Sequence, residues 1–305
     1  MRDQNWDVII AGGGPAGLSA ALLLGRSRRR VLVIDAGSPR NRFADQMHGV
    51  LGNEGTPPQD LLARGRAEVA EYGVEFCDGT IEQVERMADG LSVTTGDGLA
   101  RSTRALVVAT GLTDDLPAIP GLAERWGTSV LHCPYCHGWE VRDRRLGVLT
   151  TSPLGLHQAE LVRQWSENLT VFTAGLGPVA RDTEQRLRSR GIELVSEPVT
   201  EILGEDRSVT AVRLESGREV PLDAIFTGGI PRPHDGFLTS LGLKRNETPV
   251  GSFLDVDFAG RTSDERIWAI GNVVNPGANV AMSIGAGAMT GGAVNGALVS
   301  WDFDA

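Results

Sequence analysis

Short runs of consecutive apolar residues recur along the chain, each bounded by glycine, proline or polar residues. Such runs are typical of strands buried on both faces of a parallel sheet. The clearest of them are residues 7–11, 31–34, 105–109, 146–149 and 169–172. Segments with helical character follow two of these runs, at residues 18–25 and 156–165. Strands that alternate with helices predict an α/β fold built on parallel sheets.

Later parts of the chain predict a strand pair and a long final helix. Further strands are expected at residues 209–214, 219–222 and 266–270. The helix expected over residues 280–298 contains Gly285, Gly287, Gly291 and Gly292. Glycine disfavours helices, so we expect these positions to allow another backbone or a flat group to approach closely. A chain of 305 residues exceeds the size of one hydrophobic core, and two domains are therefore expected.

The first strand is followed by a glycine-rich turn and a helix. The turn reads Gly-Gly-Gly-Pro-Ala-Gly, and the second strand ends on an acid. In this GxGxxG arrangement the first glycine permits a tight turn, the second lets a pyrophosphate approach the backbone, and the third packs helix on strand. The acid would accept hydrogen bonds from a ribose. These patterns predict a dinucleotide site at Gly12, Gly14, Pro15, Ala16, Gly17, Asp35 and Ala36.

Two of the three cysteines form a CxxC motif, Cys133-Pro134-Tyr135-Cys136. A CxxC near βαβ patterns indicates a redox-active pair, and three cysteines are too few for a disulfide framework. His132 and His137 flank the motif, but adjacent residues rarely share one tetrahedral zinc site and no second CxxC exists. We therefore expect a redox site without a metal, and an inert buried thiol at Cys77.

Composition excludes several other classes of protein. The net charge of −10 argues against nucleic-acid binding and provides no polybasic membrane anchor. No apolar run approaches the length of a membrane span. The start from Met1 to Asp7 is polar and lacks the pattern of a secretory signal, so a cytoplasmic location is expected.

Taken in order, these motifs resemble the low-molecular-weight thioredoxin reductases over essentially the whole chain. That resemblance implies two three-layer, Rossmann-like nucleotide-binding domains and a homodimer. A discontinuous FAD domain would comprise residues 1–116 and 236–305, and an inserted NADPH-like domain with the CxxC would comprise residues 117–235. It also implies that further FAD contacts come from Arg42, His48, Ala109, Thr110, Gly111, Gly271, Asn272, Asn279 and Val280. The N-terminus of the last helix would then point at the flavin.

The inserted domain departs from the reductase pattern at both ends of a nicotinamide nucleotide. Where those reductases have a glycine-rich turn, this chain has Thr150 and Ser152, followed by Pro153, which lacks an N–H. The basic residues expected after the next strand are absent until Arg181. We therefore expect a degenerate NADPH site, although a variant turn that still binds NADPH stays possible.

The surroundings of the CxxC point to a narrower resemblance. His137 follows Cys136, where the reductases have an aspartate, and Asn272 stands where they usually have another. This stretch resembles the thioredoxin-reductase-like, FAD-dependent dithiol oxidases that form the disulfides of gliotoxin, holomycin and romidepsin. The resemblance implies that a small-molecule dithiol attacks Cys133, that Cys136 faces the flavin, and that dioxygen becomes hydrogen peroxide. His137 is the candidate general base.

Two other functions stay open at this point. One is a disulfide reductase that receives electrons from NADPH at an atypical site, or from ferredoxin or another protein. The other is a non-catalytic flavoprotein that acts as a redox sensor or an interaction module. The identity of the dithiol, and whether its oxidation is biosynthetic or protective, cannot be read from the sequence.

Overall fold

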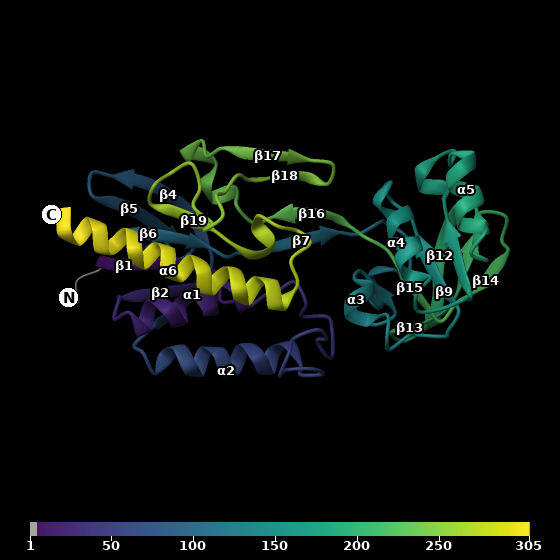
Figure 1. Ribbon diagram of the computed structural model, residues 1–305, viewed down its shortest axis with the longest axis horizontal. Helices are drawn as coiled ribbons and strands as arrows, with labels where there is room; N and C mark the ends of the chain where they lie inside the picture. The colour runs from purple at the N-terminus through teal and green to yellow at the C-terminus, as the bar shows by residue number, and fades with distance from the viewer. Residues whose placement is uncertain (1–4, 305) are drawn as a thin grey trace.

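The computed structural model describes residues 5–304 and has two domains side by side (Figure 1). Met1 to Gln4, part of the segment expected to lack a secretory signal, lie outside the described residues, as does Ala305. One domain contains both ends of the described chain, and the other contains its middle. This arrangement confirms the predicted α/β fold with two Rossmann-like domains.

The first domain is built on a seven-stranded sheet of order β3-β2-β1-β6-β5-β4, in which β19 also pairs with β6. β3, β2, β1, β6 and β19 are parallel neighbours, whereas β4, β5 and β6 form an antiparallel meander. The strands are β1 (Asn5–Ala11), β2 (Val31–Asp35), β3 (Glu75–Asp78), β4 (Ile81–Met87), β5 (Gly90–Thr95), β6 (Ala100–Val108) and β19 (Ile267–Ala269).

Helices cover one face of this sheet and short strands cover the other. The helices are α1 (Pro15–Arg26), α2 (Pro58–Ala70) and α6 (Val280–Asp304). Val8 and Ile10 pack under α1 and α6, while Ile9 points to the opposite face, as alternation along a strand requires. The opposite face of the parallel strands shares one hydrophobic core with β4 and β5 of the same sheet. The 3₁₀ helix η3 (Gly236–Leu241) and β18 (Gly251–Leu254), which pairs with β17 (Arg245–Thr248), complete this core.

The second domain has an all-parallel sheet of order β11-β10-β9-β15-β8. An antiparallel sheet of order β12-β13-β14 packs beside it and shares its core. The strands are β8 (Val130–Leu131), β9 (Leu146–Leu149), β10 (Leu169–Phe172), β11 (Glu193–Val195), β12 (Val199–Glu205), β13 (Ser208–Leu214), β14 (Glu219–Pro221) and β15 (Ala224–Phe226). Its helices are α3 (Pro134–His137), α4 (Leu154–Val162) and α5 (Arg181–Arg188), with 3₁₀ turns η1 (Ala123–Arg125) and η2 (Ala174–Leu176).

Two antiparallel strands connect the domains: β7 (Leu112–Asp115) leads out of the first domain and β16 (Ile230–Pro233) leads back (Figure 1). The pairing of Leu112–Asp115 with Ile230–Pro233 makes both crossings regular strands. The predicted boundaries after residues 116 and 235 lie just beyond these strands and stay a prediction.

The glycines of α6 divide into two groups. A Cβ at Gly287 would lie 2.2 Å from the Ala16 carbonyl oxygen, and one at Gly291 would lie 3.0 Å from the Ala20 carbonyl oxygen. These two glycines therefore bring α6 against α1. A Cβ at Gly285 would meet no protein atom within 4 Å, so the predicted close approach of another backbone is wrong at that position. No helix within residues 5–304 is both long and apolar enough to cross a membrane.

Candidate active site

A cavity of about 980 Å³ lies between the two domains and contains the CxxC motif. Its walls come from the first glycine turn, a loop at residues 38–48, the two connecting strands, the segment before α6, and the start of α4. The cavity therefore brings together segments from both ends of the chain and from its middle.

The first glycine turn opens onto this cavity through Gly12, Gly14, Pro15 and Ala16. Gly14 begins α1 without any side-chain cap, and a Cβ there would meet nothing within 4 Å. The N–H groups of the first turn of the helix are thus accessible to an anion. Gly12 has a φ of +103°, and a Cβ on it would lie 2.4 Å from the Ala109 carbonyl oxygen.

Gly17 does not line the cavity, because it makes the helix–strand contact predicted for the third glycine of the motif. A Cβ at Gly17 would lie 1.9 Å from the Gly12 carbonyl oxygen. Asp35 and Ala36 do open onto the cavity, and the Arg66 guanidinium lies 3.3 Å from the Asp35 carboxylate. An uncapped helix start beside an acid at the end of β2 fits the pyrophosphate and ribose of FAD.

Ala109, Thr110, Gly111 and Gly271, which are predicted to contact FAD, also line the cavity. Gly111 and Gly271 have φ values of +71° and +72°, so both turns need the conformational freedom of glycine. The Thr110 hydroxyl donates to the carbonyl oxygen of His234 at 2.7 Å, which ties the turn after β6 to the end of β16.

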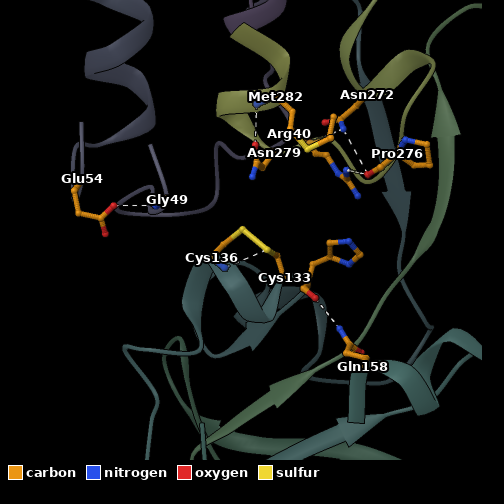
Figure 2. The surroundings of a disulfide bond; sticks show 12 residues. Arg40, Gly49, Glu54, Cys133, Cys136, Gln158, Asn272, Pro276, Asn279 and Met282 are labelled. Carbon is orange, nitrogen blue, oxygen red and sulfur yellow. Dashed lines mark hydrogen bonds between the residues drawn. A yellow bond between two sulfur atoms is a disulfide. The ribbon is translucent and has the colours of Figure 1, made fainter. Parts of the chain in front are cut away.

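Asn272 shapes the loop before α6 (Figure 2). Its side-chain nitrogen donates to the carbonyl oxygens of Asn275 and Ala278, each at 2.9 Å. A carboxylate could not donate these bonds. The amide of Asn272 therefore organises this loop. The sequence predicted only a flavin contact for Asn272 and not this structural role.

Asn279 and Val280 stand where the loop becomes α6, and both line the cavity. The Asn279 side-chain oxygen accepts from the backbone N–H of Met282 at 2.9 Å, and this bond caps the helix (Figure 2). The start of α6 thus faces the cavity, and its predicted orientation toward a flavin stays a prediction.

Arg40 holds three segments of this wall together and was missed by the sequence reasoning. Its guanidinium makes a bidentate ion pair with the Asp114 carboxylate, with both N–O distances 2.7 Å. It also donates to the Pro276 carbonyl oxygen at 2.7 Å (Figure 2). The predicted cofactor residue Arg42 instead lies outside the cavity, exposed, with its guanidinium 4.1 Å from the ring of Phe43. No local pattern distinguishes the two arginines, because the partner of Arg40 is far away in the sequence.

Cys133 and Cys136 form a disulfide that lines the cavity and faces the segments bearing Arg40, Asn272 and Asn279 (Figure 2). Cys133 precedes the short helix α3, and its sulfur accepts from the backbone N–H of Cys136 at 3.1 Å. This N–H would stabilise negative charge on the Cys133 sulfur after reduction.

All five histidines of the chain line this one cavity: His48, His132, His137, His157 and His234. Burial is the main cause that lowers the pKa of His137, the His48 charge lowers it further, and Glu140 opposes them. Burial also lowers the pKa of His132, with a further contribution from Arg40. The His132 ring is exposed on the wall of the cavity, whereas His137 is half-buried. A lowered pKa favours the neutral form, which can accept a proton from a thiol.

Glu140, three residues after His137, lies against His48 of the other domain. The His48 Nε2 atom is 3.6 Å from Glu140, and its Nδ1 atom is 2.6 Å from Glu54. The rings of His48 and His137 are arranged edge to face, with their centroids 6.2 Å apart.

In the turn after β9, which lacks the first two glycines of the motif, the Thr150 side chain fills the space between strand and helix. Thr150 is 1% exposed, and its hydroxyl donates to the Phe172 carbonyl oxygen at 2.7 Å. A Cβ at Gly155 would lie 2.9 Å from Thr150 side-chain atoms, so threonine occupies the space between strand and helix. Pro153 stands at the N-cap of α4 and makes no side-chain cap. The described residues, 5–304, contain no group of three His, Cys, Asp or Glu side chains that could hold a metal ion.

The fold and the site together define an oxidoreductase with a nucleotide turn and a redox disulfide. Residues 6–291 match the family described as pyridine nucleotide-disulphide oxidoreductase, and the chain belongs to this family. It is also similar to the thioredoxin reductase tcpT of Claviceps purpurea (strain 20.1), with 32% identity over 78% of both chains. The similarity to the thioredoxin reductase sirT of Leptosphaeria maculans covers 95% of this chain and 93% of that one, with 28% identity.

Solved structures agree with this assignment. The crystal structure of HlmI has a TM-score of 0.94 and 42% identity, covering 100% of this chain and 96% of that chain. An oxidoreductase from Agrobacterium tumefaciens has a TM-score of 0.92 and 37% identity, covering 97% and 99%. These similarities confirm the resemblance to thioredoxin-reductase-like proteins predicted from the motifs.

Proposed function

We propose that this chain is an FAD-dependent oxidase that converts a small-molecule dithiol into a disulfide, with dioxygen as the terminal electron acceptor. One observation carries the proposal. A single cavity contains the disulfide and an open first glycine turn, while Thr150 and Ser152 replace the first two glycines of the second turn. The similarity to HlmI and to tcpT is consistent with it.

The chemistry begins at the Cys133 sulfur. A substrate thiol gives its proton to neutral His137, and the thiolate attacks Cys133, which breaks the bond to Cys136 and forms a mixed disulfide. The second substrate thiolate then attacks the substrate sulfur of this mixed disulfide. That step releases the cyclic or intramolecular disulfide and leaves both cysteines reduced.

The residues of the first domain would hold the cofactor. The Gly12–Gly17 turn and Asp35 fit its dinucleotide part, and the turns at Gly111 and Gly271 and the start of α6 line the cavity opposite the cysteines. Bound FAD supplies a two-electron acceptor that reoxidises the cysteine pair and transfers the electrons to dioxygen, giving hydrogen peroxide.

The position of the disulfide favours a small substrate. Both cysteines are half-buried inside the interdomain cavity, where a compact molecule can reach them. A disulfide reductase fed by NADPH or by a ferredoxin-like protein is the second candidate, since the curated relatives are named thioredoxin reductases. The predicted partners of the chain are a second copy of itself, a small-molecule dithiol and dioxygen, and all three stay predictions.

An anaerobic titration of the flavin absorbance tests the proposal. We expect dithiothreitol to bleach the loaded protein, NADPH to leave it oxidised, and air to restore the colour with one hydrogen peroxide per dithiol. Rapid bleaching by NADPH would return the chain to the reductases. Bleaching by neither reagent would indicate a non-catalytic flavoprotein.

A further inference from the structure

A histidine of the first domain lies between carboxylates that come from both domains. The His48 Nδ1 atom is 2.6 Å from Glu54 Oε1, and its Nε2 atom is 3.6 Å from Glu140 Oε1. The other Glu54 oxygen accepts from the Gly49 N–H at 2.8 Å, which fixes this carboxylate in the loop (Figure 2). The His48 side chain is only 13% exposed.

Glu140 belongs to the same short segment as the candidate base. It comes three residues after His137, which itself follows Cys136. His137 presents its ring to His48 at an interplanar angle of 85°. The titratable groups that face His48 are therefore Glu54 on its own loop, and Glu140 and His137 from the other domain.

We propose that His48 is a positioning residue for the dithiol chemistry, which links Glu54 to Glu140 across the domain interface and sets the charge beside His137. This inference rests on the proposed function, in which His137 takes the proton of the substrate thiol. Neither His48 nor Glu140 contacts the reacting sulfur atoms in this assignment. They act through the position and the charge state of His137.

The bridge requires a doubly protonated imidazole. A neutral ring that donates from Nδ1 to Glu54 would turn the lone pair of Nε2 toward the Glu140 carboxylate, and the two would repel each other. A charged ring donates from Nδ1 to Glu54 and lies 3.6 Å from Glu140 through Nε2, so its charge offsets both carboxylates. The same positive charge disfavours a proton on His137, whereas the Glu140 carboxylate favours one.

This arrangement predicts shifts of opposite sign in two variants. His48→Gln removes a positive neighbour, so the pKa of His137 should rise. Glu140→Gln removes a negative neighbour, so it should fall. The shift in His48→Gln is expected to be about half a pH unit, the Coulomb effect of two charges about 6 Å apart in water. The shift in Glu140→Gln is expected to have the opposite sign. Glu124→Gln, an exposed carboxylate of the same domain, is the matched control and should shift nothing.

Two readouts separate this inference from the proposed function. An NMR titration of the His137 imidazole, assigned with His137→Gln, requires no turnover and tests the bridge even if the protein oxidises no dithiol. The acid limb of kcat/KM for dithiothreitol oxidation should move in parallel with it.

Opposite shifts of His137 in the two variants would support the bridge. An unchanged His137 titration, or shifts of the same sign, would overturn it. If His48→Gln does not fold, the exposed position of Glu140 keeps the second variant informative: a downward shift supports the bridge and no shift refutes it.

Discussion

The turn after β1 and the turn after β9 differ in single side chains. At the first turn Gly14 leaves the space at the start of α1 open, whereas at the second Ser152 stands at the corresponding position. Thr150 replaces the first glycine of that turn, packs between strand and helix and bonds to Phe172. A side chain at the position of Gly14 reduces the space in which a pyrophosphate can approach the backbone. The asymmetry between the domains therefore arises from a few atoms.

The two cysteines are expected to react differently as single thiols. In Cys136→Ser the backbone N–H of residue 136 still points at the Cys133 sulfur, since it does not depend on the side chain. We expect this variant to react with 5,5′-dithiobis(2-nitrobenzoate) about 10-fold or more faster than Cys133→Ser, because the thiolate is stabilised. Both variants should lose dithiol turnover.

Mass spectrometry of the adduct, followed over time, measures the reaction rate of each variant and checks this prediction. Both variants would carry Cys77→Ser, because Cys77 is a free and half-buried cysteine rather than the fully buried one expected from the sequence. Equal rates in the two variants, or a faster Cys133→Ser, would show that Cys136 is the interchange thiol.

At the scale of elements, the packing of α6 on α1 orders the first domain. α6 contacts α1 through Gly287 and Gly291, and its N-terminus reaches the cavity. Its other glycines, such as Gly285 and Gly292, face open space. The same residue type therefore has a packing role on one side of the helix and only a cost in propensity on the other.

Alanine substitutions should separate these two sides of α6. Gly287→Ala places a methyl group 2.2 Å from a backbone oxygen, and we expect it to lower the free energy of unfolding by about 1–3 kcal/mol. Gly292→Ala meets nothing and should raise it by about 0.5–1 kcal/mol through helix propensity. Urea denaturation of the two variants measures both values, and a destabilising Gly292→Ala would contradict an open face.

At the scale of the whole molecule, the two domains meet around the cavity through polar contacts. Arg207 from the β12–β13 turn donates to the Phe43 carbonyl oxygen at 2.6 Å and lies 3.5 Å from Asp45. A Cβ at Gly127 would lie 2.6 Å from the Phe43 Cβ, so the domains also approach closely there. The cavity between the domains has His132, which is exposed, and His137, which is half-buried, on its wall.

Stability should therefore depend on pH through these two histidines. Their pKa values are lowered from 6.5 in the folded protein, mainly by burial, so the unfolded chain takes up protons at a higher pH than the folded protein. The contribution of these two histidines to the free energy of unfolding is expected to be constant above pH 6.5 and to fall as the pH drops below that value.

Urea denaturation at a series of pH values tests this dependence. The double variant His132→Gln/His137→Gln should show a shallower loss of stability on acidification than the native protein. His157→Gln, which removes another histidine of the cavity wall, is the control. A double variant with the native pH dependence would assign the acid sensitivity to other groups.

Much of the fold could be predicted because buried strands are continuous apolar runs. The run at residues 146–149 became β9, and residues 169–172 became β10, with the predicted bounds. β4 was not predicted, since Ile81, Val84 and Met87 recur every third residue, a spacing closer to that of a helix. Pairing with β5 forms this strand, and such pairing overrides the local pattern.

The sequence by itself determined the features that depend on neighbouring residues: the open glycine turn, the CxxC, the loss of the second turn and the start of α6. Each is a local requirement of backbone shape or side-chain volume. Only the tertiary structure decided that Arg40 rather than Arg42 joins the cavity wall, that Glu140 meets His48, and that Gly287 but not Gly285 packs on α1. These contacts join segments distant in the chain, and they exist only once the domains and helices pack together.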